Sequence, residues 1–221
     1  MRLQSDQPLR ARVEIKTRNL GGESDKQKQQ AEGTSSVIVE SGPQGLKLSW
    51  SPEQIKQSRK AAWEKTANPD APKSKLATLT ALDAGEALNL LDAADPLRRW
   101  LENALLQEDK PDAFEGKSAR LLVIRVDLRL NEEGRKAMKS SEAVLKLWLD
   151  GNGVPMGLDR DIHIRFSKFF LSYRVREHET REFQGAGGRL CVTRASHDSS
   201  GSGLGHSEES HSTTNVTLLS D

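Results

Sequence analysis

Charged and apolar residues alternate near the start of the chain, in a pattern typical of a half-buried β-strand. Over 10–18, every second residue is Ala, Val, Ile or Thr, and the residues between them are Arg, Glu or Lys. A period of two residues places the two kinds of side chain on opposite faces of a strand. Apolar runs at 35–40 and 46–50, separated by a turn containing Gly and Pro, predict two more strands. We therefore expect a three-stranded meander, with a mobile hairpin loop over 21–33 because that stretch is almost entirely polar.

The sequence pattern predicts helices in the middle of the chain. Ser51 and Gln54 form a capping-box pattern around a proline at the first helical position, which predicts a helix over 52–66. A second capping signal and apolar residues at helical spacing predict two further helices over 83–105, separated by an Asp-Pro break. We therefore interpret 51–108 as a helical insertion that follows the third strand.

Strands return after the helices. The run 121–128 is apolar on both faces, which indicates a central strand, and a short helix is expected over 131–139. The next strand, 143–150, ends at a Gly-Asn-Gly sequence suited to a tight hairpin. As a single strand, 156–183 would be roughly 95 Å long at about 3.4 Å per residue, which is too long for one domain. We therefore place a turn at 167–168 and expect two antiparallel strands.

The pattern of the whole chain predicts an α+β fold. Strands are expected over 189–196 and 213–219, with a long serine-rich polar loop over 199–212 between them. Eight or nine antiparallel strands result, in a single domain covering 1–221. Because strand twist accumulates across a sheet of long strands, we expect a half-barrel whose concave face is covered by the inserted helices, 51–108.

The concave face is the predicted ligand site. The strands from 143 to 183 carry apolar residues at alternate positions, and the inserted helices would lie opposite them. The two surfaces either pack together or leave a gap that an apolar ligand fills. The residues predicted to line that gap are Leu147, Leu149, Ile162, Ile164, Leu171, Tyr173 and Trp100.

Composition and charge exclude several classes of protein. The 33 basic and 32 acidic residues give a net charge of +1 without a basic face, so we expect no nucleic-acid partner. Cys191 is the only cysteine, which excludes intrachain disulfides and cysteine-rich zinc sites. No run of about 18 apolar residues occurs, so we do not expect a transmembrane protein.

The start of the chain leaves two cellular compartments open. Met1 is followed by polar residues where a secretory leader would have an apolar core. Either the protein is cytoplasmic, or Met1 stands before a mature periplasmic domain whose signal peptide has been removed. We favour the periplasmic interpretation because the first strand follows the polar start so closely.

Two groups of residues are candidates for chemistry on a strand. Asp159, Asp161, His163 and Arg165 share one face of a predicted strand and could hold a general base, but the solvated face of an antiparallel sheet has the same pattern. Cys191 lies between apolar residues with no base placed beside it, so it is a weak candidate nucleophile. We therefore predict no catalytic residues.

The histidines near the end of the chain form the densest group of potential metal ligands. On a strand His206 and Glu208 share a face that excludes His211, and on a helix the two histidines diverge. Neither regular structure gathers these ligands, so we interpret the segment as a loop with incidental histidines. We expect no metal site and no cofactor.

The segment 147–156, Leu-Trp-Leu-Asp-Gly-Asn-Gly-Val-Pro-Met, followed by long strands, resembles a hairpin of the periplasmic lipoprotein-carrier family and its envelope relatives. The resemblance implies an open half-barrel with helices over an apolar cavity that accepts acyl chains. It also implies a lipid or another envelope protein as partner. One feature departs from the family, because the carriers begin with a helix and this chain begins with the strand at 10–18.

These observations favour a non-enzymatic cell-envelope protein that binds a lipid or other apolar ligand in the concave face of a half-barrel. The alternative is a structural or protein-interaction module whose core is completely filled. A hydrolase ranks third, because no catalytic motif supports it.

Overall fold

The structure is a computed structural model that describes residues 7–22, 29–68, 82–128, 132–168, 171–203 and 206–219. The strands are β1 (Leu9–Gly22), β2 (Gln29–Gly42), β3 (Gly45–Trp50), β4 (Leu105–Phe114), β5 (Lys117–Arg125), β6 (Met138–Leu149), β7 (Pro155–Lys168), β8 (Leu171–Ala186), β9 (Arg189–Gly203) and β10 (His206–Leu219). The helices are α1 (Pro52–Ala67), α2 (Ala84–Leu91), α3 (Ala94–Leu101) and α4 (Glu132–Ala137).

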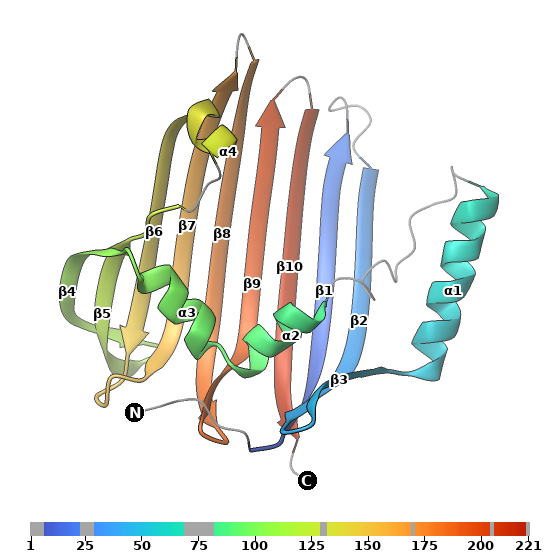
Figure 1. Cartoon of the computed structure of the whole chain (residues 1–221), viewed down its shortest axis with the longest axis horizontal. Coiled ribbons are helices and arrows are strands. Elements are labelled where there is room, and N and C mark those ends of the chain that lie inside the picture. The colour runs from blue at the N-terminus through green and yellow to red at the C-terminus, as the bar shows by residue number, and fades with distance from the viewer. Residues whose placement is uncertain are drawn as a thin grey trace.

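All ten strands of the described part of the chain belong to one antiparallel sheet, which is curved and not closed (Figure 1). The order across the sheet is β3-β2-β1-β10-β9-β8-β7-β6-β5-β4. Helices α2 and α3 lie across one face, which we call the inner face, and the opposite face is the outer face (Figure 1). The predicted α+β class and open, half-barrel-like sheet are confirmed, with ten strands in place of eight or nine.

Alternation along β1 sets the two faces of the sheet as expected. Ala11, Val13 and Ile15 are buried on the inner face, while the charged residues between them are exposed or half-buried. The meander of β1, β2 and β3 is confirmed. The loop predicted over 21–33 is wrong at both ends, because β1 continues to Gly22 and β2 begins at Gln29; residues 23–28 lie outside the described part. Backbone pairing between the two long strands extends the ladder irrespective of side-chain polarity.

The polar loop predicted over 199–212 is also wrong. Its residues form the end of β9 and the start of β10, which pair with each other from His206 opposite Gly203 to Asn215 opposite Arg194. Strand β9 also pairs with β8 on its other side along its length. A strand with neighbours on both sides has its backbone N–H and C=O groups satisfied, so serines occupy it despite their low β-propensity.

Helix boundaries follow the capping residues. Both capping boxes formed, with the Ser51 hydroxyl accepting from Gln54 N–H and the Asp83 carboxylate accepting from Glu86 N–H. The helix predicted to continue through Leu105 instead ends at Leu101, and Leu105 begins strand β4, which the sequence pattern did not predict. Strand β4 is almost wholly exposed and lies at the edge of the sheet, so it needs no apolar alternation and tolerates a proline.

Two of the inserted helices, α2 and α3, lie across the sheet between its two edge strands. Strand β3, before the helices, and strand β4, after them, are the two edge strands. Between them the chain crosses the inner face through α2 and α3, whereas α1 stands beside the sheet beyond β2 (Figure 1). The crossing is attached to β9, where Ala93 N–H donates to the Leu190 carbonyl at 2.8 Å and the Cys191 thiol donates to the Leu91 carbonyl at 3.4 Å.

The hydrophobic core lies between these two helices and the inner face. It joins residues from α2 and α3 to residues from β1, β2, β5, β6, β7, β9 and β10. Its largest fully buried side chains include Leu91, Leu145, Leu158 and Leu190. The helices are therefore part of the core and hold the curved sheet in its shape.

Candidate functional site

Two cavities lie between the helices and the inner face of the sheet. The first, which we call the α3 cavity, has a volume of about 420 Å³ and lies between α3 and strands β6, β7 and β8. The second, the α2 cavity, has a volume of about 450 Å³ and lies between α2 and strands β1, β8, β9 and β10. Asn89, Arg160 and Arg181 line both of them, so the two cavities adjoin at these side chains.

The α3 cavity combines apolar walls with positive charge. Its apolar lining comes from Pro96, Trp100, Val126, Leu128, Ala143 and Ile162. Its polar lining comes from Asn89, Arg99, Asn103, Asp127, Arg160 and Arg181. Small-molecule sites also combine apolar walls with convergent polar groups, although polar residues make up half of this lining.

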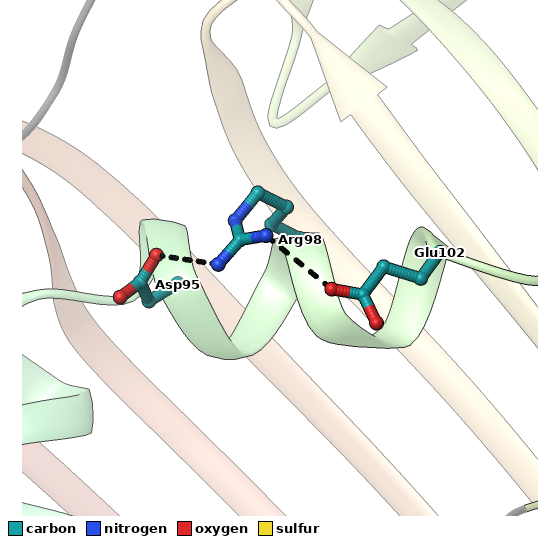
Figure 2. A network of polar contacts seen from close by, with 3 residues as sticks. All are labelled: Asp95, Arg98 and Glu102. Carbon is teal, nitrogen blue, oxygen red and sulfur yellow. Dashed lines mark hydrogen bonds and ion pairs between the residues drawn. The ribbon is translucent and has the colours of Figure 1, made fainter.

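Helix α3 brings Trp100 to the cavity because the helix is amphipathic. Pro96 and Leu97 are buried against the sheet, and Trp100 follows on the same side. On the exposed side, Arg98 lies between Asp95 and Glu102, with N···O distances of 3.3 Å to each carboxylate (Figure 2). These ion pairs at three- and four-residue spacing stabilise a short helix at its surface.

A buried cluster of charges occupies the junction of the two cavities. Arg160 on β7 pairs with Glu179 on β8, with 2.6 Å between Arg160 Nη2 and Glu179 Oε2. Arg181 donates from Nε to Glu179 Oε1 at 2.6 Å. Both guanidinium groups lie by the Trp100 ring, with Cζ atoms 4.3 and 5.3 Å from its centroid. The Glu179 side chain is only 7% exposed, so this cluster is held away from solvent.

Two of the seven predicted ligand-binding residues, Trp100 and Ile162, line the α3 cavity. Leu147 is 3% exposed within the core, and Leu149 packs against that core. Ile164 and Tyr173 are half-buried and line neither cavity, and the Leu171 side chain lies outside the described part. The structure therefore brings together only part of the predicted set, and the use of these residues in binding stays a prediction.

Tyr173 lies toward the far end of β8. Its hydroxyl donates to Glu208 Oε1 at 3.0 Å. Burial, followed by the neighbouring Glu208 carboxylate, raises the pKa of Tyr173. This tyrosine therefore links β8 to β10 across Gly201 of β9, where a Cβ atom would collide with its hydroxyl.

Sequence reasoning missed Arg160, Glu179 and Arg181. One signal was available for Arg160, because it occupies the alternate position between Leu158 and Ile162 on an otherwise apolar face. A charged residue in an apolar row is costly to bury unless a partner neutralises it. That partner, Glu179, lies directly opposite on the next strand.

The candidate groups on the outer face lie on the side of the sheet opposite the cavities. Asp159 and Asp161 are half-buried there, while His163 and Arg165 are exposed. His178 of β8 completes a group with the two aspartates whose potential ligand atoms all lie within 4.8 Å of one another. His178 Nδ1 is 2.9 Å from Asp161 Oδ1, which is the distance of a hydrogen-bonded pair.

The histidine-rich segment near the end of the chain is strand rather than loop. His211 Nδ1 lies 2.6 Å from Asp198 Oδ1 of the facing strand. Glu208 accepts the Tyr173 hydroxyl, and the His206 side chain lies outside the described part. The two contacts are therefore cross-strand pairs.

Cys191 should be unreactive in the folded protein. It is fully buried beneath α2, and burial raises the pKa of the thiol to about 11. Because the thiolate is the reactive form, we expect iodoacetamide at pH 8 to label native protein far more slowly than urea-unfolded protein, as measured by intact mass. Labelling at equal rates would contradict the buried placement of Cys191.

Comparison with known proteins gives no relative from which to transfer a function. No protein-family model, curated protein or solved structure matches the chain. Among the described residues, no helix combines the length and the apolar character needed to cross a membrane.

Proposed function

We propose that this protein is a non-enzymatic binding protein that holds an apolar ligand, such as a lipid acyl chain, in the α3 cavity. The observation that carries the proposal is the cavity of about 420 Å³ between Trp100 of α3 and Ile162 of β7. Ligand sites typically occupy about 300–1,000 Å³ and are mainly apolar with a few polar groups. The open, curved sheet supports the proposal because it leaves this space beside the hydrophobic core.

The proposal includes a location in the periplasm, with the cytoplasm as the alternative. It rests on the resemblance of the segment 147–156 to the lipoprotein carriers. That segment forms a tight hairpin between β6 and β7, in which Asp150 Oδ1 accepts from the N–H groups of Asn152 and Val154, both at 2.8 Å. Gly153 has a φ of 79°, which glycine adopts without strain.

A second candidate function, a protein-interaction module, is supported by α1. This helix stands beside the sheet (Figure 1), and its Trp63 side chain is 72% exposed. Large exposed aromatic side chains are typical of surfaces that meet another protein. In this alternative, the partner is another envelope protein and the cavities hold no ligand.

Filling the α3 cavity should weaken ligand binding. We expect a naturally fluorescent polyene fatty acid to bind delipidated protein, and Ile162→Trp to weaken that binding at least about tenfold because the indole would occupy the ligand's space. The measurement is a fluorescence titration, with circular dichroism to check folding.

The matched control is Ile38→Trp on the outer face of β2. Ile38 is half-buried between Val37 and Val39, which are buried on the inner face, so the same substitution there leaves the cavity unchanged. Its probe affinity should equal that of the parent protein. If the folded parent protein binds no acyl probe, the binding proposal fails and the interaction module is favoured.

A further inference from the structure

We infer that the ligand is an amphiphile with an anionic head group, a carboxylate or a phosphate, and that Arg160 binds this group where the two cavities adjoin. The inference rests on the proposed function, because it identifies the polar end of the same ligand. Its basis is the charge and the hydrogen bonding of the buried cluster formed by Arg160, Glu179 and Arg181.

Charged side chains line the α3 cavity. Three arginines and one aspartate, namely Arg99, Arg160, Arg181 and Asp127, line the α3 cavity. Arg99 and Asp127 are exposed, as is Glu86 of the adjoining α2 cavity. Within the buried cluster, Arg160 and Arg181 share the single carboxylate of Glu179, which leaves an excess of positive charge there. A partly buried cationic excess is costly, and an anionic ligand group would neutralise it.

The guanidinium groups of Arg160 and Arg181 contact Glu179 through different numbers of nitrogen atoms. Arg181 presents both Nε and Nη2 to Glu179 Oε1, at 2.6 and 2.5 Å. Arg160 presents only Nη2 to Glu179, as an ion pair with Oε2, and both Arg160 Nε and Glu179 Oε2 are buried without a hydrogen-bond partner among the described residues. A guanidinium has five N–H donors, and because Nε is enclosed, the donors that Arg160 retains for a further acceptor are those of its Nη atoms.

Trp100 and Glu179 together fix the orientation of the Arg160 guanidinium. The Trp100 ring lies against Arg160, with the Cζ atom 4.3 Å from the ring centroid, and Glu179 takes Nη2. A guanidinium held in this way binds an oxyanion through its remaining donors, in the planar geometry that suits carboxylate and phosphate. The apolar residues Ile162, Val126 and Leu128 of the same cavity would then contact the alkyl chain.

The test compares ligands that differ only in the head group. Palmitic acid, hexadecyl phosphate and hexadecanol would each displace the fluorescent polyene fatty acid from delipidated protein at neutral pH. We expect at least one of the two anions to bind about tenfold or more tightly than the alcohol, because hydrogen bonds between two charged groups are stronger than those of a neutral hydroxyl. The tighter anion identifies the head group as carboxylate or phosphate.

Variants then assign the discrimination to Arg160. Arg160→Met keeps an apolar side chain of similar length, and it should bring the affinity for palmitic acid to within about threefold of that for hexadecanol. The matched control is Arg98→Met on the exposed side of α3, which should preserve the difference (Figure 2).

The outcomes separate this inference from the proposed function. If the alcohol binds the parent protein as tightly as both anions, the anionic head group is wrong while apolar binding stands. If none of the three binds, the proposed function fails. The comparison on the parent protein remains decisive even if Arg160→Met does not fold.

Discussion

The Leu91→Ala variant should lose about 2–5 kcal/mol of unfolding free energy, the usual cost of removing a fully buried leucine side chain. Leu91 ends α2 with a side chain that is 0% exposed, and its carbonyl accepts the Cys191 thiol of β9. It therefore packs where the helical crossing is attached to the sheet. Alanine would leave a void at this attachment, and urea unfolding followed by circular dichroism would measure the loss.

The same helix supplies a matched control for this prediction. Leu88 is 44% exposed and lies one turn before Leu91. Leu88→Ala should therefore change the unfolding free energy by less than about 1 kcal/mol. Similar losses in the two variants would contradict the packing of α2 against the sheet.

The Arg189→Met variant should lose about 3–5 kcal/mol, because it removes a buried cation from its partners. Arg189 is buried at the start of β9, where it donates to the Ser41 hydroxyl of β2 and the Gln7 carbonyl, both at 2.9 Å. Its positive charge also interacts with Asp92. Burial raises the pKa of Asp92 above its usual value, and the charge of Arg189 lowers it in part. Chemical unfolding at neutral pH would measure the loss.

The pH dependence of the Arg189→Met deficit tests the role of Asp92. Without Arg189, the pKa of Asp92 in the folded state should rise further above its unfolded value. A group with a raised folded pKa binds its proton more tightly in the folded state, so lowering the pH through that pKa favours folding. The deficit relative to the parent protein should therefore shrink as the pH falls.

Asp92→Asn in the Arg189→Met background provides the control. The amide carries no charge, so it should recover part of the lost stability at neutral pH and remove the pH dependence of the deficit. A deficit that stays constant with pH would show that the hydrogen bonds to Ser41 and Gln7 account for the whole effect.

The sequence pattern predicted the parts of the fold that depend on residues adjacent in sequence. The alternation in β1, the capping box at Ser51 and the turn at Gly153 each depend on a few adjacent positions, and each formed as expected. Strand β4 and the serine-rich ends of β9 and β10 could not be predicted in this way. Their strand structure comes from pairing with residues distant in sequence, such as His211 opposite Asp198.

In the candidate site too, the residues set by local periodicity were predicted and those set by strand pairing were not. Trp100 and Ile162 were predicted because helical and strand periods place apolar residues toward the core. The cluster of Arg160, Glu179 and Arg181 depends on which strands are neighbours and on their register, with Arg160 directly opposite Glu179. A single strand's pattern contains no information on that register, so the charged part of the site emerged only from the structure.

The pairing of β1 with β10 has a consequence for how the protein folds during synthesis. These strands come from opposite ends of the sequence, with Arg10 opposite Leu219, yet they lie side by side within the sheet. Until β10 has been made, the two groups of strands, β3-β2-β1 and β9 to β4, cannot be joined, so β1 and β9 are additional unpaired edges. Bare strand edges invite pairing with other chains, and such distant contacts form slowly. The nascent chain is therefore most exposed to aggregation just before its tenth strand joins the two groups.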